Sequence, residues 1–167
     1  MKIGLISDTH GYLDERVLHH FAQCDEIWHA GDVGDQSVID RLEQIAPVRV
    51  VFGNIDGPEI RNKYPEIDQF YCERIVVFMI HIGGKPPKYA KGVLSLLKKH
   101  KPKLFICGHS HILKIMPDKD LDNMIYLNPG AAGNQGFHKM KTIVRFEVDK
   151  SELKNLEVIE LGLRGKA

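Results

Sequence analysis

Five short apolar runs along this chain are each followed by side chains of the kind that bind metal ions. The pairs are KIGLIS with Asp8 and His10, EIWHAG with Asp32, VVFG with Asn54, VVFMI with His81, and LFICG with His109 and His111. Short apolar runs bounded by turn signals are typical of buried β-strands. In α/β proteins, ligand sites form where the carboxyl ends of such strands meet. The seven side chains are therefore expected to gather at one edge of a sheet.

The first half of the chain alternates strand-like and helix-like segments. The predicted strands are residues 2–7, 26–31 and 48–53, and the predicted helices are residues 14–22 and 36–46. Pro47 directly follows the second helix and ends it. Strands that alternate with helices form parallel sheets with right-handed crossovers, so we expect a parallel sheet here.

The second half of the chain is richer in strands. Two strands are predicted around a turn near Glu73, followed by a helix over residues 89–100 and a strand over 103–108. Further strand-like runs cover residues 111–117, 124–130, 139–149 and 152–161, separated by turn signals such as DKDLDN and NPGAAGN. Late strands close in sequence pair as hairpins or a meander. The whole pattern predicts an α/β fold of two packed, mixed β-sheets with helices outside.

Composition limits the classes of function. A chain of 167 residues suits a single domain, residues 1–167, with a full-sized core. The formal net charge of +1 gives no bulk electrostatic reason to expect a membrane surface or a nucleic acid polymer as partner. The one dense basic run, KKHKPK at 98–103, is better explained as a helix C-terminus than as an anion-binding patch.

Cysteine usage and the N-terminus both point to the cytoplasm. Cys24, Cys72 and Cys107 are widely spaced and form no CxxC motif, which favours reduced thiols. Cys107 lies in an apolar run and is expected to be a buried small hydrophobe. The N-terminal apolar run is too short for a signal peptide, and no stretch has the length of a membrane helix.

The seven strand-end residues suit two metal ions better than one. They comprise two carboxylates, four imidazoles and one amide, which are too many donors for one zinc ion. His109 and His111 are two residues apart, so each could reach a different ion. Gly31, Gly53 and Gly108 precede ligand positions and are expected to permit sharp backbone turns. The nitrogen and oxygen donors suit manganese, which is favoured, or nickel, iron, cobalt or zinc.

The remaining histidines carry a different expectation. A single histidine is more often structural than a ligand, and we interpret His19, His20, His29 and His100 in this way. Trp28 and His29 share a predicted strand and are taken as packing residues. His138, in the loop NQGFHKM, is expected to border the site, where it could contact substrate.

The ordered motifs resemble those of the calcineurin-like metallophosphoesterases. The matching pieces are DTH at 8–10, GD at 31–32, GNID at 53–56, His81, and GHSH at 108–111, and the resemblance extends from residue 1 to about 148. The short length and LNPG at 127–130 look most like the small prokaryotic phosphodiesterase branch. That branch also resembles the eukaryotic retromer subunit called vacuolar protein sorting 29.

The resemblance implies a four-layer αββα sandwich of two mixed β-sheets flanked by helices. It also implies two ligand sets, which are Asp8, His10, Asp32 and His111 for one ion, and Asp32, Asn54, His81 and His109 for the other. Asp32 would bridge the two ions, and Asp56 would orient the site. The implied reaction is hydrolysis of a small phosphoester, most readily a phosphodiester, by in-line attack of a metal-bridging hydroxide, with Asp32, Asn54 and His81 as catalytic residues.

The chain departs from the family pattern at two positions. Many members have a histidine where Ile55 stands, and many have another histidine where Gly83 stands. Isoleucine cannot donate a proton. The departures imply weaker catalysis and a preference for esters with good leaving groups, whose proton would come from water or from another group such as His138.

Two alternatives and some properties stay open. A non-catalytic metal-binding scaffold of the retromer-subunit type has no evident need for seven intact positions. A nuclease would need a basic stripe or an aromatic platform, which the sequence lacks. Specificity is expected to come from loops 11–14, 55–66, 83–88 and 129–138. The oligomeric state is not encoded in any pattern, so a homo-oligomer stays open.

Overall fold

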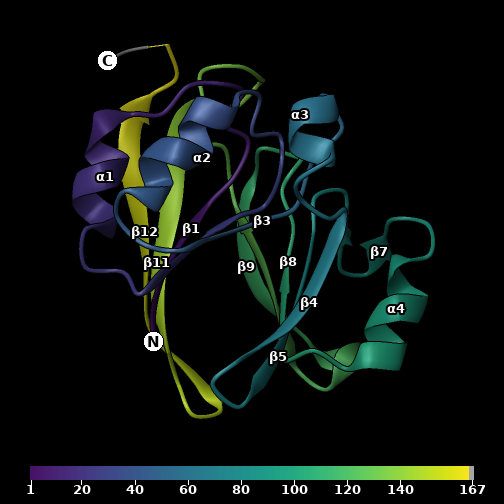
Figure 1. The fold of residues 1–167 in the computed structure, drawn as a ribbon. Helices are drawn as coiled ribbons and strands as arrows, with labels where there is room; N and C mark the ends of the chain where they lie inside the picture. Colours follow the sequence, from purple (N-terminus) through teal and green to yellow (C-terminus); the bar gives the residue numbers. More distant parts are fainter. Residues whose placement is uncertain (166–167) are drawn as a thin grey trace.

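Two mixed five-stranded sheets form the body of the protein (Figure 1). The computed structural model describes residues 1–165. The first sheet has the order β12-β11-β1-β2-β3, with β1 Lys2–Ile6, β2 Glu26–His29, β3 Val48–Val50, β11 Met140–Asp149 and β12 Glu152–Leu163. The second has the order β4-β5-β8-β10-β9, with β4 Ile67–Cys72, β5 Ile75–Ile80, β8 Leu104–Ile106, β9 Leu113–Asp118 and β10 Met124–Pro129. A short 3₁₀ turn, η1 (Lys119–Leu121), joins β9 to β10.

The strand directions confirm the predicted parallel core of the first sheet. β1 pairs in parallel with β2, and β2 with β3, connected through α1 (Glu15–Phe21) and α2 (Gln36–Glu43). The hairpin β11–β12 then returns from the far end of the chain and lies antiparallel beside β1. In the second sheet β5, β8 and β10 run parallel, and the antiparallel strands β4 and β9 form its edges.

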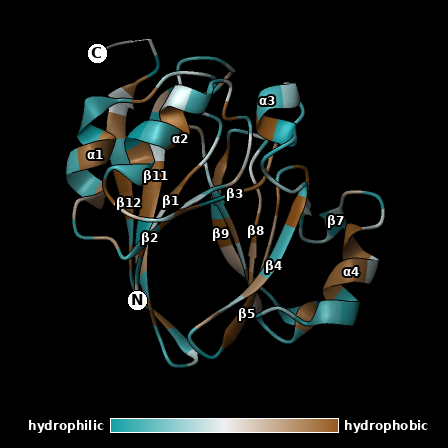
Figure 2. Ribbon diagram, viewed as in Figure 1, coloured by the Kyte–Doolittle hydropathy of each residue, from teal (hydrophilic) through white to brown (hydrophobic). Residues whose placement is uncertain are grey.

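Three apolar layers hold the sheets and helices together. Val17 of α1 and Ile39 of α2 pack on the outer face of the first sheet. Trp28 belongs to the buried cluster between the two sheets. Val93 and Leu97 of α4 (Val93–His100) pack on the outer face of the second sheet. Figure 2 shows the apolar colour on the helix faces that meet the sheets. The fold is therefore the expected αββα sandwich.

Two segments differ from the sequence prediction. The helix predicted over residues 89–100 begins only at Val93, because Gly92 has a left-handed backbone with φ of 82° and breaks the run. Residues 88–89 instead form β7 (Lys88–Tyr89), which pairs with β6 (Gly84–Lys85) in a small ribbon. Residues 55–66, predicted as a loop, contain the short helix α3 (Pro58–Arg61), which starts with proline at its first turn.

Other predictions are confirmed. Cys24, Cys72 and Cys107 are free and buried, and burial raises the pKa of Cys107 to about 11. The basic run ends α4, where Lys98, Lys99 and His100 occupy the last turn. Within residues 1–165, no helix combines the length and the apolar composition needed to cross a bilayer.

Candidate metal centre

The strand-end residues converge where the two sheets meet. Two groups of potential ligand atoms form there, and within each group all the atoms lie within 4.8 Å of one another. The first group comprises Asp8, His10, Asp32 and His111. The second group comprises Asp32, His81 and His109. Asp32 belongs to both groups. Its Oδ2 lies 3.6 Å from His10 Nε2 and 3.2 Å from His81 Nε2. This carboxylate therefore stands between the two groups.

The backbone at these positions is mostly left-handed. The residues concerned are Asp8, His10, Asp32, His109 and His111, whose φ angles are 53°, 48°, 52°, 68° and 58°. Such conformations cost about 1–3 kcal/mol each for a non-glycine residue and persist only where the surroundings fix them. Backbone hydrogen bonds do so here, since Asp8 N donates to Gly31 O and His10 N donates to Asp32 O, both at 3.0 Å.

The glycines act differently from the prediction. Of Gly31, Gly53 and Gly108, only Gly31 has a positive φ, of 97°. At Gly53 and Gly108 the need is space, because an added Cβ would lie 2.1 Å from Asp32 Oδ1 or 2.1 Å from Ser7 Oγ. The prediction that glycine supplies the sharp turns is therefore wrong at Gly53 and Gly108. After Gly108 the left-handed residue is His109 itself, with φ of 68°.

Several buried polar atoms of this centre have no hydrogen-bond partner. Among the described residues these include Asp8 Oδ1, His10 Nε2 and His81 Nε2. Asp8 Oδ2 is satisfied by Ser7 Oγ at 2.7 Å and by His109 N at 3.1 Å, which leaves Oδ1 facing His111 Nε2 at 3.1 Å. Buried polar atoms are normally paired. Nitrogen and oxygen atoms left unpaired around two carboxylates fit divalent cations.

The ring of His81 is held in one tautomer. Its Nδ1 lies 2.7 Å from Ala30 O, and because a carbonyl oxygen only accepts, Nδ1 carries the proton. The lone pair of Nε2 then faces Asp32 in the neutral ring. Burial lowers the pKa of His81, but the carboxylates of Asp32 and Asp8, which lie 3.2 and 3.8 Å from Nε2, outweigh it, so the net pKa is raised. A positive charge is favoured between these acceptors.

His138 fixes the tautomer of the His111 ring in a similar way. Its Nε2 lies 2.9 Å from Gly133 O and must donate, while burial lowers its pKa and favours the neutral ring. His138 Nδ1 therefore accepts from His111 Nδ1, 3.2 Å away, and His111 Nε2 keeps its lone pair toward Asp8. Gly136 makes room, because a Cβ there would lie 2.0 Å from His111 Nδ1. His138 thus borders the centre as expected, in contact with His111.

Asp56 connects two loops of the centre. Its Oδ1 accepts from Gly34 N at 2.8 Å and its Oδ2 accepts from Gly53 N at 2.7 Å. Arg61 of α3 binds the same region, donating through Nη2 to Gly53 O at 3.1 Å and to Asn54 O at 3.3 Å. Arg61 could not be predicted as part of the centre, because nothing in its local sequence pattern distinguishes it from a surface arginine.

Two further residues, Asn128 and His29, support loops of the centre by hydrogen bonds that were not predicted from the sequence. Asn128, in the LNPG motif, donates to Gly108 O at 2.8 Å and supports the GHSH loop. His29, taken as a packing residue, pairs through Nε2 with Thr9 Oγ1 at 2.9 Å and accepts from Gly31 N at 3.2 Å. Burial lowers the pKa of His29 to about 4, so the ring is neutral near pH 7.

Asn54 and Ile55 lie at the more open side. The amide oxygen of Asn54 is 2.9 Å from His109 Nδ1, which places Asn54 beside the second group. Ile55 donates its backbone N–H to Asp32 Oδ1 at 3.1 Å, and its side chain is exposed. At the other departure from the family pattern, a Cβ on Gly83 would lie 2.6 Å from Phe105 Cζ. A histidine would not fit at position 83.

Comparison with known proteins agrees with this geometry. Residues 1–151 match the sequence profile of the calcineurin-like phosphoesterase superfamily domain. A probable metallophosphoesterase of Methanocaldococcus jannaschii is 33% identical over 96% of this chain and 83% of that protein. A probable metallophosphoesterase of Methanothermobacter thermautotrophicus is 32% identical over 78% of this chain and 77% of that protein.

The fold also has relatives among solved structures. Vps29 of Entamoeba histolytica, in a crystal structure complexed with Zn²⁺, aligns with a TM-score of 0.75 at 17% identity, covering 96% of this chain and 98% of that chain. At this identity the likeness concerns the fold. The family profile and the two curated relatives carry the assignment further, and this chain belongs to the calcineurin-like phosphoesterase superfamily.

Proposed function

We propose that this protein is a phosphodiesterase that uses two divalent metal ions. One ion would be held by Asp8, His10, Asp32 and His111, and the other by Asp32, Asn54, His81 and His109, with manganese favoured. The observation that carries the proposal is the set of buried, unpaired acceptor atoms around Asp32. When bound, two such ions polarise the phosphoryl group and activate water for attack on phosphorus.

The residues of the chain hold and orient this centre. Ala30 O and His138 keep the lone pairs of His81 and His111 directed inward. The amide of Asn54, whose Oδ1 lies 2.9 Å from His109 Nδ1, would also contact a bound phosphoryl oxygen. Because Ile55 cannot donate a proton, the leaving group must be a weak base or take its proton from water. A phosphodiester with a good leaving group fits this site best.

The experiment compares the wild-type protein with Asp32→Ala. Metal content after loading with Mn²⁺ and hydrolysis of bis-p-nitrophenyl phosphate are measured in both. Loss of the shared carboxylate is expected to lower metal content and to reduce hydrolysis roughly a thousand-fold, since metal ions supply several kcal/mol of transition-state stabilisation. Asp40→Ala, an exposed position on α2, is the control. Full activity of Asp32→Ala would refute the proposal.

A second candidate function is a non-catalytic scaffold. The likeness to Vps29 structures, which reaches a TM-score of 0.77, supports it. The same experiment separates the two functions, because a scaffold would take up metal in the wild-type protein without hydrolysing any of a set of phosphomonoesters, diesters and cyclic nucleotides.

A further inference from the structure

A cavity of about 350 Å³ adjoins the candidate metal centre. His109, a member of the second ligand group, forms part of its wall, and the ribbon β6–β7 and the GHSH loop form much of the rest. Three lysines line it, which are Lys85, Lys88 and Lys114. Its volume is in the lower range of pockets that hold small ligands, about 300–1,000 Å³. A molecule bound at the metal centre can therefore extend into it past His109.

The walls of this cavity are held in place. The hydroxyl of Tyr126 donates to Gly84 O at 2.9 Å, which ties the ribbon to the second sheet. Gly83 packs so closely on Phe105 and Cys107 that no side chain fits there. Asn128 donates to Ser110 Oγ at 3.1 Å on the opposite wall. A cavity fixed by such contacts loses little conformational freedom when a ligand binds.

The charge of the cavity is of one sign. No acidic residue lines it, and no carboxylate of residues 1–165 forms an ion pair within 4.0 Å with Lys85, Lys88 or Lys114. Ile112, which is 62% exposed, supplies an apolar surface beside them. The lysine charges are therefore available to an anionic ligand that also has an organic part.

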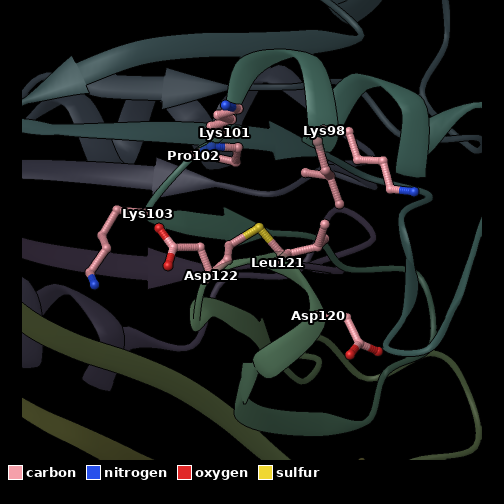
Figure 3. A pocket seen from close by; sticks show the side chains of 9 residues that line it. Lys98, Lys101, Pro102, Lys103, Asp120, Leu121 and Asp122 are labelled. Carbon is pink, nitrogen blue, oxygen red and sulfur yellow. The ribbon is translucent and has the colours of Figure 1, made fainter.

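A second, larger cavity provides the contrast. It measures about 560 Å³ and lies between α4 and η1, on the outer side of the second sheet. Figure 3 shows Asp120 and Asp122 among its lysines. The lysines there are Lys98, Lys101 and Lys103, and none of the candidate metal ligands lines it. Its mixed charge gives no preference for an anion, so it serves as an internal control.

We propose that the cavity beside His109 binds a second anionic group of the substrate, of the phosphate type. This inference rests on the proposed phosphodiesterase function and narrows it. The substrate would be a phosphodiester whose non-leaving arm ends in a phosphate-like group. The reacting phosphorus lies at the metal centre, the arm passes His109, and the terminal anion binds the three lysines.

The test uses two esters that differ only in that arm. One is ethyl p-nitrophenyl phosphate, and the other is 2-phosphonoethyl p-nitrophenyl phosphate, so the leaving group is the same. With Mn²⁺ present, the wild-type protein is expected to show a KM about ten-fold lower for the phosphonoethyl ester, which corresponds to one charge-assisted contact. Substitution of all three lysines, K85M/K88M/K114M, should bring the two KM values together.

The control variant is K98M/K101M/K103M, which removes the same charge from the other cavity and should keep the ten-fold difference. Equal KM values in the wild-type protein would overturn the inference. A difference that survives in K85M/K88M/K114M would also overturn it, since the phosphonate would then be binding elsewhere, for example to the metals.

Failure of the proposed function is distinguishable from failure of this inference. If neither ester is hydrolysed, the phosphodiesterase proposal fails, and calorimetric titration with the phosphonoethyl ester decides on the cavity. Binding that is about ten-fold weaker in K85M/K88M/K114M than in the control variant supports the anion site. Binding that is equal in the two variants, or absent in the wild-type protein, overturns it.

Discussion

Two clusters of buried charge in this protein are built in opposite ways. In the first, near the start of α1, Asp14 accepts hydrogen bonds from Arg16 Nη2 at 2.6 Å and from the wholly buried Lys141 Nζ at 3.0 Å. In the second, the candidate metal centre, Asp8 and Asp32 are also buried. In the described part of the chain, the only basic side chains within 4.0 Å of these two carboxylates are histidines.

The difference concerns where the positive charge comes from. The Asp14 cluster is compensated by the chain itself, and the arginine and lysine hold the pKa of Asp14 far below its usual range despite its burial. The metal centre leaves its carboxylates to be compensated from outside, by protons or by cations. The first arrangement balances its charges within the fold, whereas the second is expected to gain stability when a cation binds.

The largest effect on stability is expected at the compensated cluster. Asp14→Asn keeps a residue that can cap α1 but removes the charge that faces Lys141 and Arg16. Because Lys141 and Arg16 both lose this carboxylate, the free energy of unfolding should fall, by up to about 3–5 kcal/mol. Urea denaturation followed by the fluorescence of Trp28, the single tryptophan, measures it.

Metal content distinguishes the two clusters in this variant. Folded Asp14→Asn should bind as much Mn²⁺ as the wild-type protein, because Asp14 belongs to neither ligand group. A variant as stable as the wild type, or one that had lost metal, would show that the two clusters are not independent.

The second effect is a pH dependence of the free energy of unfolding that is caused by His29. His29 has a pKa of about 4 in the folded protein against a usual 6.5, because burial opposes its charge. As the pH falls from about 6.5 to 4, the unfolded chain takes up a proton that the folded chain does not. The free energy of unfolding should therefore fall by about 3 kcal/mol across this window.

His29→Gln provides the comparison for this pH dependence. Its denaturation midpoints, measured in metal-free buffer between pH 7 and 4, should vary less with pH than those of the wild-type protein. Equal slopes would mean that other groups, such as the carboxylates, cause the loss of stability.

The sequence predicted which residues gather at the candidate metal centre better than it predicted the backbone conformation that places them. The seven residues could be found because each follows an apolar strand, and strand ends meet at a sheet edge whatever the details of the loops. The left-handed backbone at Asp8 or His10 could not be found, because it depends on hydrogen bonds between loops distant in sequence. The place of β11 beside β1 is a long-range pairing that no local pattern encodes.

His138 shows the same limit at one residue. Its presence near the centre could be proposed from the loop that carries it, but its contact with His111 depends on Gly136 and on the carbonyl of Gly133. For helix α4 the apolar spacing predicted the helix but placed its start four residues too early, at residue 89 instead of Val93. Periodicity does not detect that Gly92 has a left-handed backbone.

The third effect concerns metal affinity. His138→Phe keeps an aromatic ring but removes the nitrogen that accepts from His111 Nδ1. Without this partner His111 is free to take the other tautomer, which points an N–H at the metal position. The dissociation constant for Mn²⁺ should rise about 10–100-fold. Calorimetric titration measures it, and the ¹⁵N shifts of the His111 ring in metal-free protein report the tautomer.

His19→Phe, at an exposed histidine of α1, is the matched control and should bind Mn²⁺ normally. Unchanged affinity in His138→Phe, with unchanged His111 shifts, would mean that the ring is oriented by its packing against His10 instead.

The smallest effect has the opposite sign to the first and tests the comparison most directly. Asp8→Asn removes one of the two uncompensated charges, while its side-chain oxygen can still accept from Ser7 and His109 N. In metal-free protein at neutral pH, the free energy of unfolding should rise by about 1 kcal/mol, because functional sites hold strain and repulsion that substitution relieves. Saturating Mn²⁺ should stabilise the wild-type protein and leave Asp8→Asn nearly unchanged. Removing a buried carboxylate charge would thus destabilise one cluster and stabilise the other. A loss of stability in metal-free Asp8→Asn would mean that the histidines already compensate this centre as protonated rings, and that it is built like the Asp14 cluster after all.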